Sequence, residues 1–199
     1  MMENTGIILL AAGNSTRMGT AKQLLFYQGK TLLGRTIDTV LEVFNKDQII
    51  LVLGANHNHI TSKIQHQNIP ITVNEHWESG MASSIKSGLE TLINSFPEME
   101  RCFISVCDQP FLISDVFLEM MTLNKTSKKE IITAQYADTT GVPALFSKKY
   151  FEKLMNLTGE QGAKKIIQQN MDDVETFEFE QGSIDIDTKE DYENLKSKQ

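Results

Sequence analysis

The chain has 199 residues, of which 40% are hydrophobic and 23% charged, and its net charge is −7 at pH 7. This composition is that of a soluble globular protein, and the length suits one domain spanning residues 1–199 better than two. The negative charge argues against a nucleic-acid-binding protein, and no apolar run of the sequence is long enough to span a membrane. The first residues carry no secretory signal pattern, so we expect a cytoplasmic protein.

Strand and helix patterns alternate through the first two thirds of the chain. Apolar runs predict strands at 6–11, 48–53, 71–73, 101–106 and 130–134. Helical spacing of apolar residues predicts helices at 32–44, 57–65, 82–94 and 115–124. This alternation is typical of βαβ units with right-handed crossovers around a mostly parallel sheet.

The remainder is less regular. Its patterns predict strands at 142–146 and 175–179, helices at 149–155, 163–169 and 189–196, and a polar surface loop at 125–130. Such a tail favours an antiparallel strand on an otherwise parallel sheet. The predicted fold class is therefore a single-domain, Rossmann-like, three-layer α/β/α architecture.

The loop after the first predicted strand has the composition of a phosphate-binding loop. Small residues begin at Ala12, and Arg17, Gly19 and Lys22 follow. Small residues let backbone N–H groups approach a phosphate, Arg17 offers a planar fork of donors, and Lys22 offers a compact positive charge. Neither the P-loop motif nor the dinucleotide-binding Gly-x-Gly-x-x-Gly spacing is present. The alternative is a βα turn with incidental charges.

Loops at the carboxyl ends of parallel strands converge on one crevice, so residues after the other strands join this site. Asp108 directly follows a buried strand and is a natural Mg²⁺ ligand. The alternative is that Asp108 opens a turn before Pro110 or caps the next helix, for which Ser114 is the better cap.

Two further segments carry candidate site residues. Asp185 and Asp187 alternate, so they share a face if extended, and we expect Asp185 to bind metal while Asp187 or Thr188 caps the last helix. Gly80 and Ser84 lie where a loop turns into a helix, whose N–H groups suit a base or sugar; the alternative is a plain cap and turn.

Other residues favour structural readings. Cys102 and Cys107 lie five apart on a predicted strand, so we expect buried free thiols on opposite faces. Trp77 either closes over a ligand or is a partly buried anchor.

These motifs together resemble the signature of the MobA-like nucleotidyltransferases, and most closely that of the molybdenum cofactor cytidylyltransferases. The resemblance spans nearly the whole chain and rests on these segments: Leu10-Ala11-Ala12-Gly13-x-Ser15-x-Arg17-Met18-Gly19-x-x-Lys22, Gly54-Ala55, Asn74-x-x-Trp77-x-x-Gly80-Met81-x-x-Ser84, Asp108-Gln109-Pro110, Gly141-Val142-Pro143-Ala144 and Asp185-Ile186-Asp187-Thr188-x-Glu190-Asp191. The guanylyltransferase branch tends to have Gly at position 12 and Met at position 109. Relatives often have Asp and Arg where this chain has Glu160 and Lys164.

The resemblance implies transfer of CMP from CTP to the terminal phosphate of the molybdopterin-type molybdenum cofactor, with release of pyrophosphate. Lys22, Arg17 and Asp108 would be the catalytic residues, with Mg²⁺ on Asp108 and Asp185. The nucleotide would contact a larger set: Leu10, Ala11, Ala12, Gly13, Arg17, Lys22, Gly54, Gly80, Ser84 and Asp108.

Partners and alternatives follow from the same resemblance. CTP and the molybdopterin cofactor would be the small-molecule substrates, and a molybdenum hydroxylase a transient protein partner. The alternatives are a guanylyltransferase, a sugar- or alditol-phosphate nucleotidyltransferase, and a nucleotide-binding chaperone that hands cofactor to a hydroxylase without turnover.

Overall fold

A seven-stranded mixed sheet forms the centre of the molecule, in the order β5-β4-β1-β6-β8-β7-β9. The structure is a computed structural model that describes residues 2–64, 67–160 and 162–197. The strands of this sheet are β1 (Thr5–Ala11), β4 (Ile49–Leu53), β5 (Ile71–Val73), β6 (Arg101–Val106), β7 (Ile131–Tyr136), β8 (Thr139–Ser147) and β9 (Val174–Glu178). Strands β5, β4, β1 and β6 are mutually parallel, whereas β8 runs antiparallel to both β6 and β7. The predicted mostly parallel sheet with an antiparallel strand is confirmed.

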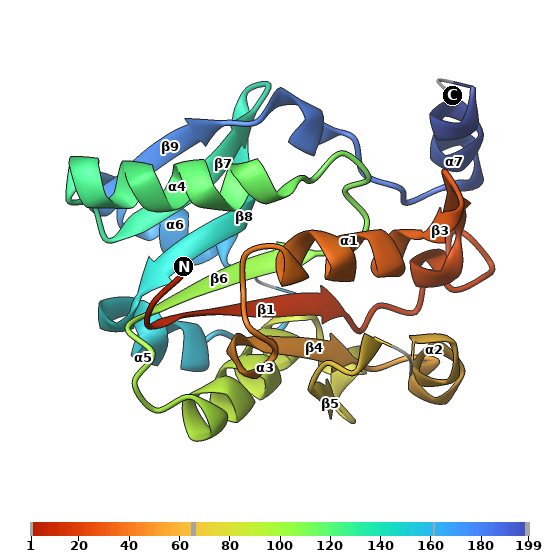
Figure 1. Cartoon of the computed structure of the whole chain (residues 1–199), viewed down its shortest axis with the longest axis horizontal. Coiled ribbons are helices and arrows are strands. Elements are labelled where there is room, and N and C mark those ends of the chain that lie inside the picture. The colour runs from red at the N-terminus through yellow and green to blue at the C-terminus, as the bar shows by residue number, and fades with distance from the viewer. Residues whose placement is uncertain (1, 65–66, 161, 198–199) are drawn as a thin grey trace.

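Helices cover both faces of this sheet and give three layers (Figure 1). Residues of α1 (Leu32–Leu41), α2 (His57–Ile64) and α4 (Ser114–Ser127) pack into one core cluster. Residues of α3 (Met81–Ser95), α5 (Phe151–Met155) and α6 (Lys164–Gln169) pack into the cluster on the other face. None of the helices in the described part of the chain is long and apolar enough to cross a membrane.

The first strand shows why the sequence folds this way. Ile7 and Leu9 enter one core cluster, while Ile8 and Leu10 enter the other. A strand covered on both faces needs apolar residues at every position, which is why β1 reads as a continuous apolar run. The same alternation buries Cys102 and Cys107 in different clusters, so the prediction of two buried free thiols on opposite faces is confirmed.

A third, small cluster joins the two ends of the chain. It contains Tyr27 and Leu32, around the hairpin of β2 (Phe26–Tyr27) and β3 (Lys30–Thr31), together with Ile186 and Leu195 near or in α7 (Lys189–Lys196). The Tyr192 hydroxyl donates to the Phe26 carbonyl at 2.8 Å. This contact places the last helix beside the loop that follows β1, as Figure 1 shows.

Several predicted boundaries need correction. Helix α1 ends at Leu41 rather than residue 44, and α4 continues to Ser127, so half of the predicted 125–130 loop is helical. The N-cap residue of α4 is Ile113, which makes no side-chain capping bond. The prediction that Ser114 caps this helix is therefore wrong. The last position of the predicted 57–65 helix, Gln65, lies outside the described residues.

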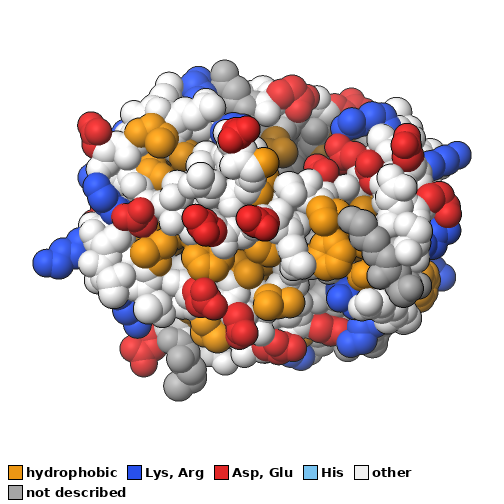
Figure 2. Space-filling model, turned by 90° about the horizontal axis from the view of Figure 1, so that it is seen from above, with side chains coloured by type: hydrophobic (Ala, Val, Ile, Leu, Met, Phe, Trp, Pro, Cys, Tyr) orange, Lys and Arg blue, Asp and Glu red, His pale blue; other side chains and the backbone are white. Residues whose placement is uncertain are grey.

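One face of the molecule is rich in acidic side chains. On the face seen in Figure 2, these side chains spread across the centre and basic ones lie mostly at the edges. An acidic centre of this kind repels the phosphate backbone of a nucleic acid. The cations that matter for the site lie instead in the loop after β1.

Candidate active site

A cavity of about 700 Å³ opens at the carboxyl ends of β1 and β6. Its lining comes from the loops after these strands, the start of α3, the β7–β8 region and the segment before α7. Most of the predicted site residues line it, namely Leu10, Ala11, Ala12, Gly13, Arg17, Lys22, Gly80, Ser84, Asp108 and Asp185. Gly54 is not among the lining residues. The loops after β1, β5 and β6 therefore converge on one cavity as predicted, whereas the loop after β4, which carries Gly54, does not line it.

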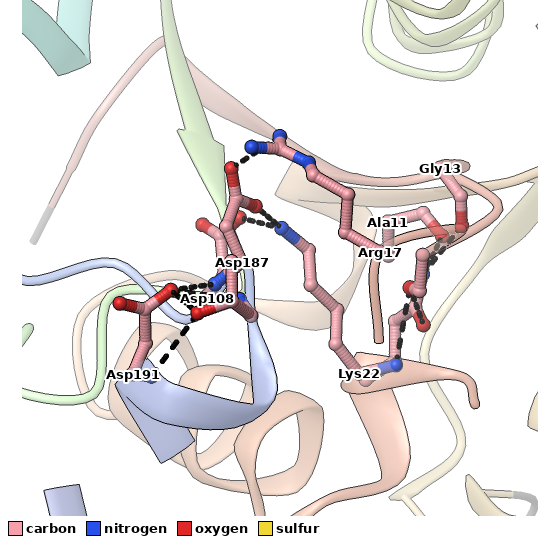
Figure 3. Close-up of polar contacts among 10 residues, drawn as sticks. Ala11, Gly13, Arg17, Lys22, Asp108, Asp187 and Asp191 are labelled. Atoms are coloured by element: carbon pink, nitrogen blue, oxygen red, sulfur yellow. Dashed lines mark hydrogen bonds and ion pairs between the residues drawn. The ribbon is translucent and has the colours of Figure 1, made fainter. Parts of the chain in front are cut away.

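Lys22 is the centre of the polar network in this cavity (Figure 3). Its Nζ donates to Asp108 Oδ2 and to Asp187 Oδ1, each at 2.5 Å. Burial alone would lower the pKa of Lys22, but the charge of Asp108 and the hydrogen bonds to both carboxylates outweigh it and raise that pKa. The ammonium is therefore charged at neutral pH and held on the cavity wall.

Asp187 holds a second cation as well. Its Oδ2 accepts from the Arg17 guanidinium at 2.7 Å, so one carboxylate bridges Arg17 and Lys22 (Figure 3). Hydrogen bonding to Lys22 is the main reason that the pKa of Asp187 is lowered. The prediction that Asp187 could cap α7 is wrong, because Thr188 is the cap and shares a capping box with Asp191.

Asp185 lies on the same cavity wall but in a different electrostatic setting. The ion pairs of Lys22 go to Asp108 and Asp187, and none within the described residues goes to Asp185. Desolvation, followed by the charges of Asp108 and Asp187, raises the pKa of Asp185. A carboxylate that forms no ion pair with the described cations of the protein is suited to accept an external one.

The oxygen donors fit a divalent cation that arrives with a nucleotide. Within the described ranges, no group of three or more His, Cys, Asp or Glu side chains is arranged as a ready-made metal site. Mg²⁺ is commonly bound by one or two carboxylates together with substrate phosphates, and it prefers hard oxygen ligands. Asp108 and Asp185 on one wall of the cavity fit that pattern.

The loop after β1 is shaped by a residue that sequence reasoning missed. Gln23 is 1% exposed, and its Nε2 donates to the carbonyls of Ala11 at 2.9 Å and Gly13 at 3.0 Å. Ser15 Oγ accepts from the Lys22 backbone N–H at 3.1 Å. These bonds fold the loop back on the end of β1, and they turn Arg17 and Lys22 toward the cavity. A polar residue one position after Lys22 gave no pattern by which to find it.

Gly54 shapes the site although it does not line the cavity. A Cβ there would lie 2.6 Å from the Trp77 Cβ and 2.8 Å from the Ala12 carbonyl oxygen. The neighbouring Ala55 N–H donates to that same carbonyl at 3.0 Å. Gly54 thus lets Trp77, which lines the cavity, pack against the end of β1. Trp77 is half-buried, as the reading of a partly buried anchor predicts.

At the start of α3, some polar groups already form hydrogen bonds within the protein. Gly80 adopts φ of 96°, where a side chain would also collide with the Gly159 carbonyl. The Ala82 N–H donates to that carbonyl at 3.2 Å, so it is not available to a ligand. Ser84 Oγ accepts from Asn74 Nδ2 at 3.0 Å. Gly80 therefore brings the 159–160 segment against the mouth of the cavity.

The comparisons identify the class of protein. Residues 7–174 match the model of the MobA-like NTP transferase domain, and the chain belongs to this family. It is 28% identical over 194 residues to the molybdenum cofactor cytidylyltransferase of Escherichia coli K12, covering 96% of this chain and 95% of that protein.

Two solved structures are similar to this chain in both fold and sequence. Rv0371c of Mycobacterium tuberculosis H37Rv is 29% identical, with a TM-score of 0.79 and coverage of 96% of each chain. A manganese complex of the same protein is 27% identical, with a TM-score of 0.78 and 96% coverage of each chain. The chain is therefore a nucleotidyltransferase of the MobA-like type.

Proposed function

We propose that this chain, acting as one domain over residues 1–199, transfers CMP from CTP to the terminal phosphate of a molybdopterin-type cofactor and releases pyrophosphate. The observation that carries the proposal is the Lys22 ammonium, clamped on the cavity wall between Asp108 and Asp187 at 2.5 Å each. The charged ammonium, oriented by the two carboxylates, can meet charge that develops on a phosphate. The similarity to a cytidylyltransferase and Ala12 in the loop after β1 favour cytosine as the base.

The reaction needs positioning and charge neutralisation rather than a covalent protein nucleophile. A phosphate oxygen of the acceptor forms a bond to the α-phosphorus of CTP, and the bond from that phosphorus to the bridging β-phosphate oxygen breaks. Lys22 stabilises the charge on the α-phosphoryl oxygens, and Arg17 holds the departing β- and γ-phosphates. Leu10, Ala11, Ala12 and Gly13 contact the nucleotide with their backbone, while Gly80 and Ser84 border the base.

Asp108 and Asp185 would hold a divalent cation, and we propose Mg²⁺. When bound, such a cation neutralises phosphate charge as a Lewis acid. The manganese complex of the Mycobacterium tuberculosis relative supports a divalent site in this fold. A cytoplasmic location and transient contact with a molybdenum hydroxylase complete the proposal, since a dinucleotide cofactor must be passed to an enzyme that uses it.

Pyrophosphate release tests this function directly. The wild-type chain should release pyrophosphate with CTP, molybdopterin and Mg²⁺, and much less with GTP, ATP or UTP. Thermal shifts with the same four nucleotides should rank CTP first, because selective binding stabilises by mass action. Preference for GTP would make the protein a guanylyltransferase, and turnover only with a sugar or alditol phosphate would change the acceptor.

Asp108→Asn separates an enzyme from a chaperone. In an enzyme the variant should stay folded and bind CTP without turnover, because Asp187 still pairs with Lys22 at 2.5 Å when Asp108 is neutral. A chaperone that hands on cofactor would show no pyrophosphate release even as wild type.

A further inference from the structure

The segment that carries Asp185 and Asp187 is fastened to the end of β6 at two points. We call residues 182–187 the acidic strap. At its start, the Gly182 carbonyl accepts from Gln109 Nε2 at 2.9 Å. Near its end, the Ile186 N–H donates to the Asp108 carbonyl at 3.1 Å. The two carboxylates of the strap therefore lie on a short span whose ends both rest on the corner formed by Asp108 and Gln109.

Gln109 fastens a third segment as well. Its Nε2 also donates to the Val142 carbonyl in β8 at 3.0 Å, and the side chain is 4% exposed. Both amide hydrogens thus have carbonyl partners. Rotating the amide would set Oε1 against those two carbonyls, so the observed orientation is fixed. One nitrogen atom joins the end of β6, β8 and the acidic strap.

The start of the strap is also closely packed. A Cβ at Gly182 would lie 2.6 Å from Phe179 Cδ1 and 2.8 Å from Tyr136 Cδ1. The strap therefore lies against β7 without a side chain between them. Backbone contacts hold the start of the strap, the buried Ile186 side chain holds its end in the third apolar cluster, and Gln109 supplies the side-chain bond that connects its start to Asp108.

We propose that Gln109 is a positioning residue that sets where Asp185 and Asp187 lie relative to Asp108 and Lys22. This inference rests on the proposed function, since it gives the strap a part in the same reaction. Glutamine suits the task because it is neutral in a buried place and can donate twice from one atom. Asparagine has the same donors on a side chain that is one methylene shorter.

The chain contains a matched control. Gln48 is 7% exposed, and it also bridges two segments: Nε2 donates to the Met2 carbonyl and Oε1 accepts from the Asn45 N–H, both at 2.8 Å. It directly precedes β4, at the end of the sheet opposite the cavity. Gln48→Met therefore removes a buried amide with two bonds and leaves the acidic strap untouched.

The experiment compares Gln109→Met with Gln48→Met in the full chain. Melting temperature and circular dichroism establish folding, and hydrogen exchange follows the peptide that covers residues 183–188. Turnover is measured with CTP, molybdopterin and Mg²⁺, and CTP affinity is titrated separately in EDTA. Should Gln109→Met not fold, Gln109→Glu, which keeps the side-chain volume, replaces it.

In Gln109→Met we expect faster exchange over 183–188 and a fall in kcat of about 10–100-fold, the usual loss when a group that orients metal ligands is removed. CTP affinity in EDTA should stay unchanged. Gln48→Met should show none of these effects at a comparable loss of melting temperature. Equal kcat values for the two variants, or a loss that appears entirely as weaker CTP binding in EDTA, would overturn the inference.

Gln109→Glu tests the two hydrogen bonds without removing side-chain volume. A carboxyl group donates at most one hydrogen bond to the two carbonyls, and an ionised one donates none. Its kcat should therefore fall as in Gln109→Met while CTP affinity in EDTA stays unchanged, and a wild-type kcat in this variant would contradict the inference. If wild type turns over no nucleotide, the proposed function fails, and the Mg²⁺-dependent gain in nucleotide affinity then replaces kcat in each comparison.

Discussion

Asp187 and Lys22 lie 165 positions apart in the sequence, yet the Asp187 Oδ1 atom accepts a hydrogen bond from Lys22 Nζ at 2.5 Å. The other oxygen of the same carboxylate holds Arg17. Both cations that would bind a triphosphate are therefore paired with Asp187. In the proposed reaction phosphate oxygens would meet the same two cations, so we expect Asp187 and the nucleotide to compete for them.

Asp187→Asn should consequently bind metal-free CTP several-fold more tightly than wild type, because the amide competes less well for Arg17 and Lys22. Calorimetric titration in EDTA measures this difference. Asp185→Asn is the control, since it removes an equal charge from the strap without releasing either cation. An identical gain in CTP affinity in both variants would mean that the loss of one negative charge near the site explains the effect, and that the direct contact of Asp187 with the two cations does not. In Asp185→Asn we expect instead a higher Mg²⁺ concentration for half-maximal turnover.

Lys22 and Arg17 should separate into catalysis and binding. Lys22→Met should lower kcat by about 10²–10³-fold, the usual loss of one donor that meets developing charge. Arg17→Ala should act mainly on CTP affinity, because contacts to the β- and γ-phosphates exist before and during the reaction. Steady-state pyrophosphate release and direct CTP titration provide both values. A Lys22→Met variant that loses affinity in full proportion to rate would show that Lys22 binds ground and transition states equally.

Stability should respond to pH with opposite signs at the two strap carboxylates. The pKa of Asp187 is lowered from 3.8, so its charged form stabilises the fold at neutral pH, and this gain disappears only as pH falls below that value. The pKa of Asp185 is raised from 3.8, so its charged form costs stability at neutral pH, and this cost fades as pH falls toward that value.

Asp187→Asn should therefore melt lower than wild type at pH 7, and Asp185→Asn should melt higher. As pH is lowered from 7 toward 4, the Asp185→Asn difference should shrink while the Asp187→Asn difference persists. Differential scanning calorimetry across this range checks both trends. Shifts of the same sign at pH 7 would contradict the electrostatic assignment.

Gly54→Ala should disturb the nucleotide site from outside the cavity. Its new methyl group would press on Trp77 and on the Ala12 carbonyl, and overpacking of this kind costs about 1–3 kcal/mol. Weaker CTP binding and a changed emission of Trp77, the single tryptophan, are expected. Gly6→Ala is the control, because its Cβ would lie 2.6 Å from Leu92 Cδ2 at the far end of β1. That variant should lose stability without losing CTP affinity.

How far the sequence predicts this molecule depends on the range of the interaction concerned. Strand β6 and helix α7 have the bounds that local patterns predict, because apolar runs and a capping residue act within a few positions. Residues 125–127 were predicted as loop from their polarity, but they continue the exposed face of α4 until Lys128, at φ of 58°, ends it. Polar residues indicate that a segment is exposed to solvent, but they do not indicate where a helix ends.

The candidate site divides in the same way. Arg17, Lys22 and Asp108 were identified because each lies in a loop that follows a recognisable strand. The contacts of Asp187 with Arg17 and Lys22, and the bonds of Gln23 and Gln109, depend on how distant segments meet, which no local spacing encodes. A glutamine that donates to carbonyls resembles any other glutamine until its partners are known.

The third apolar cluster ties the function of the protein to its last helix. Tyr27 and Leu32 belong to the beginning of the chain, and Ile186 and Leu195 to its end. The segment that carries Asp187 is therefore held by side chains from the start of the chain and does not depend on the two large clusters alone. A substitution such as Leu195→Ala would loosen the carboxylate that pairs with Lys22 while the seven-stranded sheet and both large clusters stay in place. Loss of activity without loss of the main fold is the expected consequence, and an assay of folding alone would not detect such damage.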